Sequence, residues 1–212
     1  MPMTYEENAR NIPLETYEWD DIWYDHAPDD KLPRVMLVGD SISRGYRFPV
    51  INALNDIYHT DNWASSKAVD NPAYIKQLDL ILSQGRNYEV IHINNGHHGW
   101  HLSTEEYKVN YEKIICHIME NYPDSKIILA LTTPVRDKDT KDLSNERNML
   151  AIERNNAVIE LATKYSLPVC DLYNSPLLVN SDTYRDTVHQ NEEGYEILAK
   201  IINNKIREVS CK

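Results

Sequence analysis

The chain has 212 residues, which is enough for one domain with a sizeable core and short for two. Hydrophobic residues make up 42% and charged residues 26%, as in ordinary soluble globular proteins, and no apolar run approaches the roughly 20 residues of a membrane span. The 22 Lys and Arg against 33 Asp and Glu give a formal net charge of -11. This charge repels phosphate backbones, so we expect neither nucleic acid nor a membrane as a partner.

The N-terminal segment is acidic and aromatic, and its pattern is not that of a basic-then-apolar signal peptide. We expect residues 1–33 to form an extension packed on the main domain, with Trp19 and Trp23 as anchors. The main domain then spans residues 34–212.

Three widely separated cysteines, Cys116, Cys170 and Cys211, suit neither a disulfide framework nor a CxxC metal or redox pair. Cys116 and Cys170 stand among apolar residues, so we expect them in the core. A reducing cytoplasm is the simplest location for such a chain.

Short apolar runs alternate with helical patterns along the main domain. We predict strands at residues 35–39, around 57–59 (a weaker pattern), and at 90–93, 127–131 and 168–170. Apolar residues at helical spacing predict helices within 111–122, 150–165 and 195–202. The first of these helices, over 107–121, follows the capping-box spelling Ser103-Thr-Glu-Glu106.

Buried strands separated by helices predict a parallel sheet covered on both faces, a three-layer α/β/α sandwich. Functional groups of such folds gather at the carboxyl ends of the strands. Polar residues follow the predicted strands at Ser41, 62–67, 94–98 and 132–134, and Asp186 and His189 come just before the last helix.

Ser41 follows the first predicted strand within VMLVGDSISRGY, residues 35–46. A serine in this place is either the N-cap of the next helix or a nucleophile, and a nucleophilic serine needs a base. Asp186 and His189 are three residues apart, so the carboxylate could orient the imidazole while the other ring nitrogen faces Ser41.

GDSI at 39–42, followed far along the chain by the Asp-x-x-His pair 186–189 and NEEGYEILAKII, resembles the GDSL, or SGNH, hydrolase family of serine esterases. The resemblance covers the chain from about residue 33 onward. It implies a flavodoxin-like sandwich with a central, mostly five-stranded parallel sheet, and it implies no cofactor. By the same resemblance Ser41 is the nucleophile, and Asp186 and His189 complete the triad.

The family stabilises the oxyanion with the nucleophile's own N–H, a glycine N–H after the second strand, and an asparagine side chain. In this chain the glycine position falls on Lys67, with Ser66 as the neighbouring choice, and the lysine side chain is expected to enter or rim the pocket. The asparagine position falls on His98, with Asn94 or Asn95 as alternatives.

Several other side chains stand near the expected site. Trp100 is the candidate substrate platform, Arg44 and Tyr46 either flank the pocket or lie on an exposed helix face, and His97 or His101 forms pocket wall. Gly99 interrupts the histidine run and His92 alternates within a strand, so we expect no metal. With six glycines and no GxGxxG or GxxxxGK spelling, the chain shows no nucleotide loop.

These residues predict a serine hydrolase that cleaves an ester through an acyl-enzyme, with a small acyl group, such as acetyl on a carbohydrate, as the expected substrate. One alternative is a carbohydrate- or ligand-binding module that retains the scaffold but lacks an efficient oxyanion hole. Another is an acyltransferase, in which a sugar hydroxyl replaces water.

Overall fold

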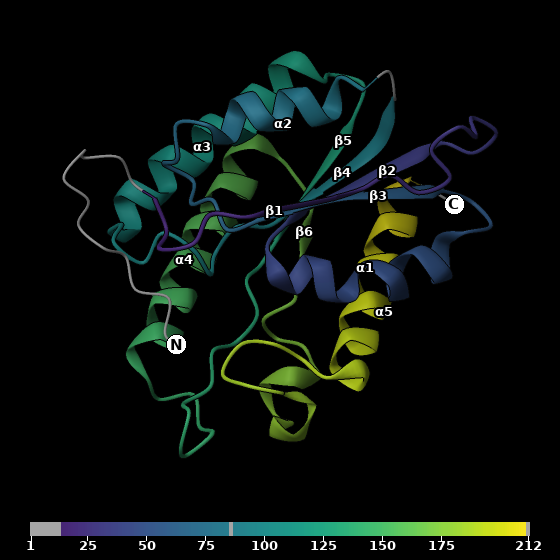
Figure 1. Cartoon of the computed structure of the whole chain (residues 1–212). Helices are drawn as coiled ribbons and strands as arrows, with labels where there is room; N and C mark the ends of the chain where they lie inside the picture. Colours follow the sequence, from purple (N-terminus) through teal and green to yellow (C-terminus); the bar gives the residue numbers. More distant parts are fainter. Residues whose placement is uncertain (1–13, 85–86, 211–212) are drawn as a thin grey trace.

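A computed structural model describes residues 14–84 and 87–210. Its centre is a six-stranded sheet with the order β1-β3-β2-β4-β5-β6 (Figure 1). The strands are β1 (Asp20–Trp23), β2 (Arg34–Gly39), β3 (His59–Ser65), β4 (Tyr88–Ile93), β5 (Lys126–Ala130) and β6 (Val169–Cys170). Strands β2 to β6 are parallel, and β1 runs antiparallel to β3 at the edge. The predicted sandwich with five parallel strands is therefore confirmed.

Helices cover both faces of the sheet (Figure 1). They are α1 (Ser41–Leu54), α2 (Tyr74–Leu82), α3 (Thr104–Asn121), α4 (Glu146–Tyr165) and α5 (Glu192–Ser210), with the short 3-10 turns η1 (Pro176–Leu178) and η2 (Ser181–Thr183). The three predicted helices correspond to α3, α4 and α5. The capping box at the start of α3 is present, because Ser103 and Glu106 each accept a hydrogen bond from the other's backbone N–H. None of the described helices has the length and apolar character that a bilayer crossing requires.

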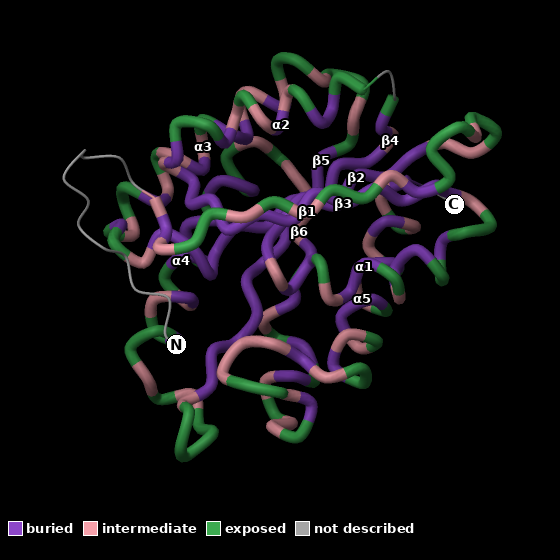
Figure 2. The backbone as a smooth tube through the Cα atoms, in the orientation of Figure 1, coloured by how far each residue is buried: buried purple, intermediate pink, exposed green. Residues whose placement is uncertain are grey.

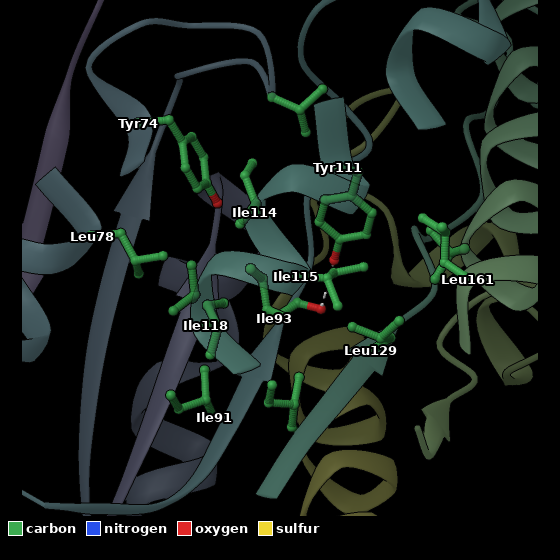
Figure 3. Packing of buried hydrophobic residues seen from close by; sticks show 14 of the residues in the cluster. Tyr74, Leu78, Ile91, Ile93, Tyr111, Ile114, Ile115, Ile118, Leu129 and Leu161 are labelled. Atoms are coloured by element: carbon green, nitrogen blue, oxygen red, sulfur yellow. Dashed lines mark hydrogen bonds between the residues drawn. The ribbon is translucent and has the colours of Figure 1, made fainter. Parts of the chain in front are cut away.

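The core is divided between the two faces of the sheet, which is buried along its middle (Figure 2). Ile91 and Ile93 of β4 pack with α2, α3 and α4, while Val90 packs with α1 and α5 on the other side. Figure 3 shows the first of these clusters, in which the Tyr111 hydroxyl donates to the Ile93 carbonyl at 3.2 Å. This double burial explains why β2, β4 and β5 are largely apolar on both faces.

The strand predicted around residues 57–59 begins too early and is too short, because β3 spans His59–Ser65. Strand β3 covers HTDNWAS, and all of its residues are buried despite their polar side chains. Asp61 accepts hydrogen bonds from Arg34 at 2.9 Å and from the Tyr88 hydroxyl at 2.8 Å, and Asn62 donates to the Leu37 carbonyl at 3.1 Å. Because these bonds replace water, the polar residues can be buried, and Asn62 lies within the strand rather than after it.

Candidate active site

Ser41 is the first residue of α1, directly after β2, and it is half-buried. The N-cap of this helix is Asp40, whose carboxylate accepts the Ile42 N–H at 2.9 Å. The Ser41 hydroxyl is therefore not the capping group. Gly39 is required at this turn, because a Cβ there would lie 2.7 Å from the Ser43 Cβ.

The loop between η2 and α5 brings a histidine and a carboxylate to Ser41. His189 Nε2 lies 2.8 Å from Ser41 Oγ, and His189 Nδ1 lies 2.8 Å from Asp186 Oδ2. An ionised carboxylate can only accept, so the hydrogen on this ring belongs on Nδ1, and Nε2 is free to accept the serine proton. The arrangement can activate a serine hydroxyl for attack.

Asp186 is held by its own loop. Its Oδ1 accepts the backbone N–H of His189 at 2.7 Å and that of Val188 at 2.9 Å. Partial burial by itself would raise the pKa of Asp186, but these two bonds and the imidazole bond outweigh it and lower the pKa below its usual value. An isolated bridge between Tyr184 and Gln190 closes the loop at its base.

The loop from β4 to α3, residues 94–103, passes beside the serine helix. The Asn94 amide donates to the Ala130 carbonyl at 2.8 Å, and the Asn95 amide donates to the Lys67 carbonyl at 2.8 Å. Both asparagine side chains thus stabilise backbone segments. Gly96 packs so closely that a Cβ would lie 1.6 Å from Thr132 Oγ1, so a larger residue is excluded there.

Arg154 of α4 holds this loop in place. Its guanidinium, which is fully buried, donates to the carbonyls of Gly96 at 3.0 Å, His98 at 2.7 Å and Gly99 at 2.5 Å. The planar guanidinium of an arginine, with its five N–H donors, suits three convergent carbonyls better than the ammonium of a lysine would. In the sequence Arg154 stands at helical spacing between the apolar residues Leu150 and Val158, and a charged residue in that place was the available signal of this role.

His97 and His98 differ in their surroundings. Burial lowers the pKa of His97 to about 4, and its Nε2 lies 3.0 Å from the Thr133 hydroxyl, so this ring is neutral at pH 7. His98 is 2% exposed, and its Nδ1 lies 3.4 Å from the buried carboxylate of Glu15. Glu15 also accepts the Gly99 N–H at 3.0 Å. The carboxylate therefore helps to orient the His98 ring.

The N-terminal arm, residues 14–25, packs against Ser66 and Lys67, the two residues expected to supply the second oxyanion donor. The Ser66 N–H donates to the Trp19 carbonyl at 3.2 Å, and the Lys67 N–H donates to Ser65 Oγ at 3.1 Å. The Lys67 ammonium lies 2.6 Å from Asp20 Oδ2 and the residue is 7% exposed. This side chain, which we expected to enter or rim the pocket, forms an ion pair with the arm.

The sequence profile of the GDSL-like Lipase/Acylhydrolase family matches residues 37–197, from β2 into α5. The chain belongs to this family. Membership identifies it as a carboxylic ester hydrolase and confirms the resemblance seen in the sequence. Among curated proteins, no sequence matches the chain.

Solved structures share the fold of this GDSL-family hydrolase at low sequence identity. An acetyl xylan esterase, AlAXEase, is 20% identical with a TM-score of 0.65, covering 82% of this chain and 99% of its own. A carbohydrate acetylesterase from Sinorhizobium meliloti is 15% identical with a TM-score of 0.68, covering 83% of this chain and 99% of its own. An aryl esterase from M. smegmatis is 14% identical with a TM-score of 0.69, covering 84% of this chain and 99% of its own.

The expected substrate residues of the hydrolase differ in their burial and in their contacts. Tyr46 is 1% exposed within the core, so its predicted place beside the substrate is not supported. Arg44 is exposed and pairs with Asp21 at 3.0 Å. Trp100 is half-buried with its ring against the guanidinium groups of Arg147 and Arg154, 5.3 and 5.0 Å from their carbons.

Four further residues of this hydrolase were singled out in the sequence. His101 lies at the surface and pairs with Asp70 at 2.8 Å. Cys170 is fully buried, as expected, while Cys116 is half-buried and contacts the Tyr165 hydroxyl at 3.2 Å. Cys211 lies outside the described residues.

Proposed function

We propose that this hydrolase cleaves its ester through a Ser41–His189–Asp186 triad and a covalent acyl-enzyme. The observation that carries the proposal is the continuous pair of 2.8 Å contacts from Asp186 through the His189 ring to Ser41 Oγ. Each role follows from these contacts. Ser41 attacks, His189 transfers the proton, and Asp186 orients and stabilises the imidazolium.

In the first half-reaction Ser41 Oγ attacks the acyl carbon while His189 Nε2 takes the hydroxyl proton. The tetrahedral intermediate collapses as His189 returns that proton to the leaving oxygen, which releases the alcohol and leaves the acyl group on Ser41. Water then gives its proton to His189 and attacks the acyl carbon. Ser41 recovers the proton as the acid departs.

The negative charge of each tetrahedral intermediate falls beside the start of α1. The N–H of Ser41 belongs to the first turn of this helix, where amides lack intrahelical partners and the helix dipole favours an anion. We assign the second donor to the N–H of Lys67, shared with Ser65 Oγ, and the third to the His98 side chain oriented by Glu15. Ser66 is the less suited neighbour, because its N–H pairs with Trp19 across the sheet edge.

A small acyl group on a carbohydrate is the proposed substrate class. The acetyl xylan esterase and the carbohydrate acetylesterase that share the fold support this class.

Two substrate series test this proposal. p-Nitrophenyl esters of increasing acyl length should show the highest kcat/KM for acetate, and acetylated xylooligosaccharides should release acetate only while Ser41 is intact. A preference for octanoate or longer would contradict the small-acyl assignment. Hydrolysis by Ser41→Ala at the unmodified rate would contradict the triad.

A binding module with weak catalysis is the second candidate, because the Ser66 N–H and the Lys67 N–H already have protein partners. It predicts that acetylated oligosaccharides raise the melting temperature while no acetate is released. Transfer to an added sugar acceptor, measured as acylated product, would instead identify an acyltransferase.

A further inference from the structure

Three metal-binding side chains from two distant segments meet at the end of β3 opposite the serine. Asp25 and His26 follow β1, and His59 is the first residue of β3. Asp25 Oδ1 lies 3.0 Å from His26 Nδ1, and Asp25 Oδ2 lies 3.9 Å from His59 Nδ1. One ligand atom from each residue lies within 4.8 Å of the other two, close enough to share one ion.

Two of these groups each carry one buried atom that has no hydrogen-bond partner among the described residues. Asp25 is 6% exposed and His59 is 5% exposed, and neither Asp25 Oδ2 nor His59 Nε2 has a hydrogen-bond partner there. Leaving buried polar atoms unpaired costs about 1–3 kcal/mol each. A bound cation would satisfy the carboxylate and fix the orientation of the imidazole.

The surroundings support the ligands without competing for them. The Arg34 guanidinium pairs with Asp61 and donates to the carbonyls of Asp25, His26 and Asp29, so it holds the loop by its backbone. His59 Nε2 lies 3.8 Å from Asp29 Oδ2. With His59 Nδ1 on a metal, Nε2–H can point to Asp29, the carboxylate–histidine–metal order found around many bound metals.

We propose that Asp25, His26 and His59 bind a divalent transition-metal ion of the zinc class, with Asp29 orienting His59. Two imidazoles and one carboxylate suit Zn²⁺ better than Mg²⁺ or Ca²⁺, which prefer oxygen ligands. The exposed side chain of His26, 63% accessible, gives the ion access from solvent and leaves room for a water ligand.

The role of this site is structural. Asp25 ends the N-terminal arm and His26 directly follows it, while His59 begins the strand with which the arm pairs, so the ion would tie β1 to β3. Strand β2 runs parallel to β3 and leads to Ser41 at its other end. The metal therefore lies about one strand length, roughly 15–20 Å, from the serine and takes no part in its chemistry.

The test uses the untagged full chain, stripped with a chelator and titrated with Zn²⁺ and, separately, Co²⁺. We expect about one Zn²⁺ per chain after desalting, a tetrahedral Co²⁺ absorption band and a higher melting temperature. His26→Ala should weaken Zn²⁺ binding at least tenfold and abolish the band without loss of the fold, because the side chain is exposed. Asp25→Asn tests the carboxylate independently.

Two control variants separate this site from other histidines. His117 pairs with Asp79 at 2.7 Å in a comparable two-residue contact, so His117→Ala should keep full metal binding. His189→Ala removes another His–Asp pair and should also keep full metal binding. Absence of stoichiometric Zn²⁺, or binding and spectrum unchanged in both His26→Ala and Asp25→Asn, would overturn the proposal.

Discussion

His189 Nε2 and Ser41 Oγ lie 2.8 Å apart although 148 residues separate them in the chain. One group stands at the carboxyl end of β2, and the other on the loop that leads into α5. Helix α5 packs against α1 on the same face of the sheet (Figure 1). The contact therefore depends on the docking of the last helix against the first.

The first prediction separates chemistry from helix capping. Ser41→Ala should abolish hydrolysis but change the free energy of unfolding by no more than about 0.5 kcal/mol, because Asp40 holds the N-cap. Asp40→Ala should cost about 1 kcal/mol by losing that cap. Rates of ester hydrolysis measure the activity of each variant, and the midpoints of urea unfolding measure its stability. A loss of stability in Ser41→Ala equal to that in Asp40→Ala would contradict this division.

The second prediction concerns His98, the proposed third oxyanion donor. His98→Ala should lower kcat by about 10²–10³ with little change in KM, the size expected for one lost donor. His98→Asn supplies an amide and should recover part of the loss. His101→Ala, a surface histidine paired with Asp70, is the matched control and should leave kcat unchanged. Equal activity in all three variants would remove His98 from the mechanism.

The third prediction compares two arginines that contact Trp100. Arg154→Met leaves three carbonyls of the β4–α3 loop without their donor, so we expect a loss of about 3 kcal/mol in stability together with a lower kcat. Arg147→Met removes the exposed guanidinium against the same ring and should change stability by less than about 0.5 kcal/mol. Unfolding curves with matched activity assays decide, and equal losses would contradict the proposed positioning role.

The fourth prediction follows from His92 and His97, whose pKa values burial lowers to about 4. The unfolded chain takes up these protons near pH 6.5 while the native chain does not, so the free energy of unfolding should fall as the pH drops from 6.5 to 4. The fall is at most about 3 kcal/mol per histidine. The stabilisation is complete above pH 6.5.

His92→Leu isolates one of these contributions. Neither ring nitrogen of His92 has a hydrogen-bond partner among the described residues, so the variant should be at least as stable as the parent at pH 7. In His92→Leu the fall in the free energy of unfolding between pH 6.5 and 4 should be about half as large as in the parent. Adding His97→Gln should remove the remaining half. Urea unfolding across this pH range measures both effects, and an unchanged slope in His92→Leu would contradict a buried neutral ring.

The parallel strands and the Ser41, Asp186 and His189 positions could be predicted because each carries a local signal. Apolar runs identify β2, β4 and β5, and the GDSI and Asp-x-x-His spellings identify the site. Strand β3 was misplaced because its polar residues are buried by partners such as Arg34 and Tyr88, which are remote in sequence. Edge strand β1 gave no apolar pattern, since its residues are largely exposed.

The surroundings of the triad depend on tertiary contacts that no spacing shows. The arm brings Glu15 to His98, and it brings Asp20 to Lys67, although Asp20 and Lys67 are 47 residues apart in the sequence. A strongly acidic segment was the available hint that its carboxylates pair with the domain. In the same way, Asp25 and His26 meet His59 only because β1 pairs with β3.

Covalent labelling by a fluorophosphonate, read by intact mass and peptide mapping, tests the activated serine most directly. The account predicts one adduct per chain, located on Ser41, with labelling lost in Ser41→Ala and strongly slowed in His189→Ala and Asp186→Asn. A folded protein that remains unlabelled, or one that is labelled at another residue while Ser41 stays unmodified, would contradict it.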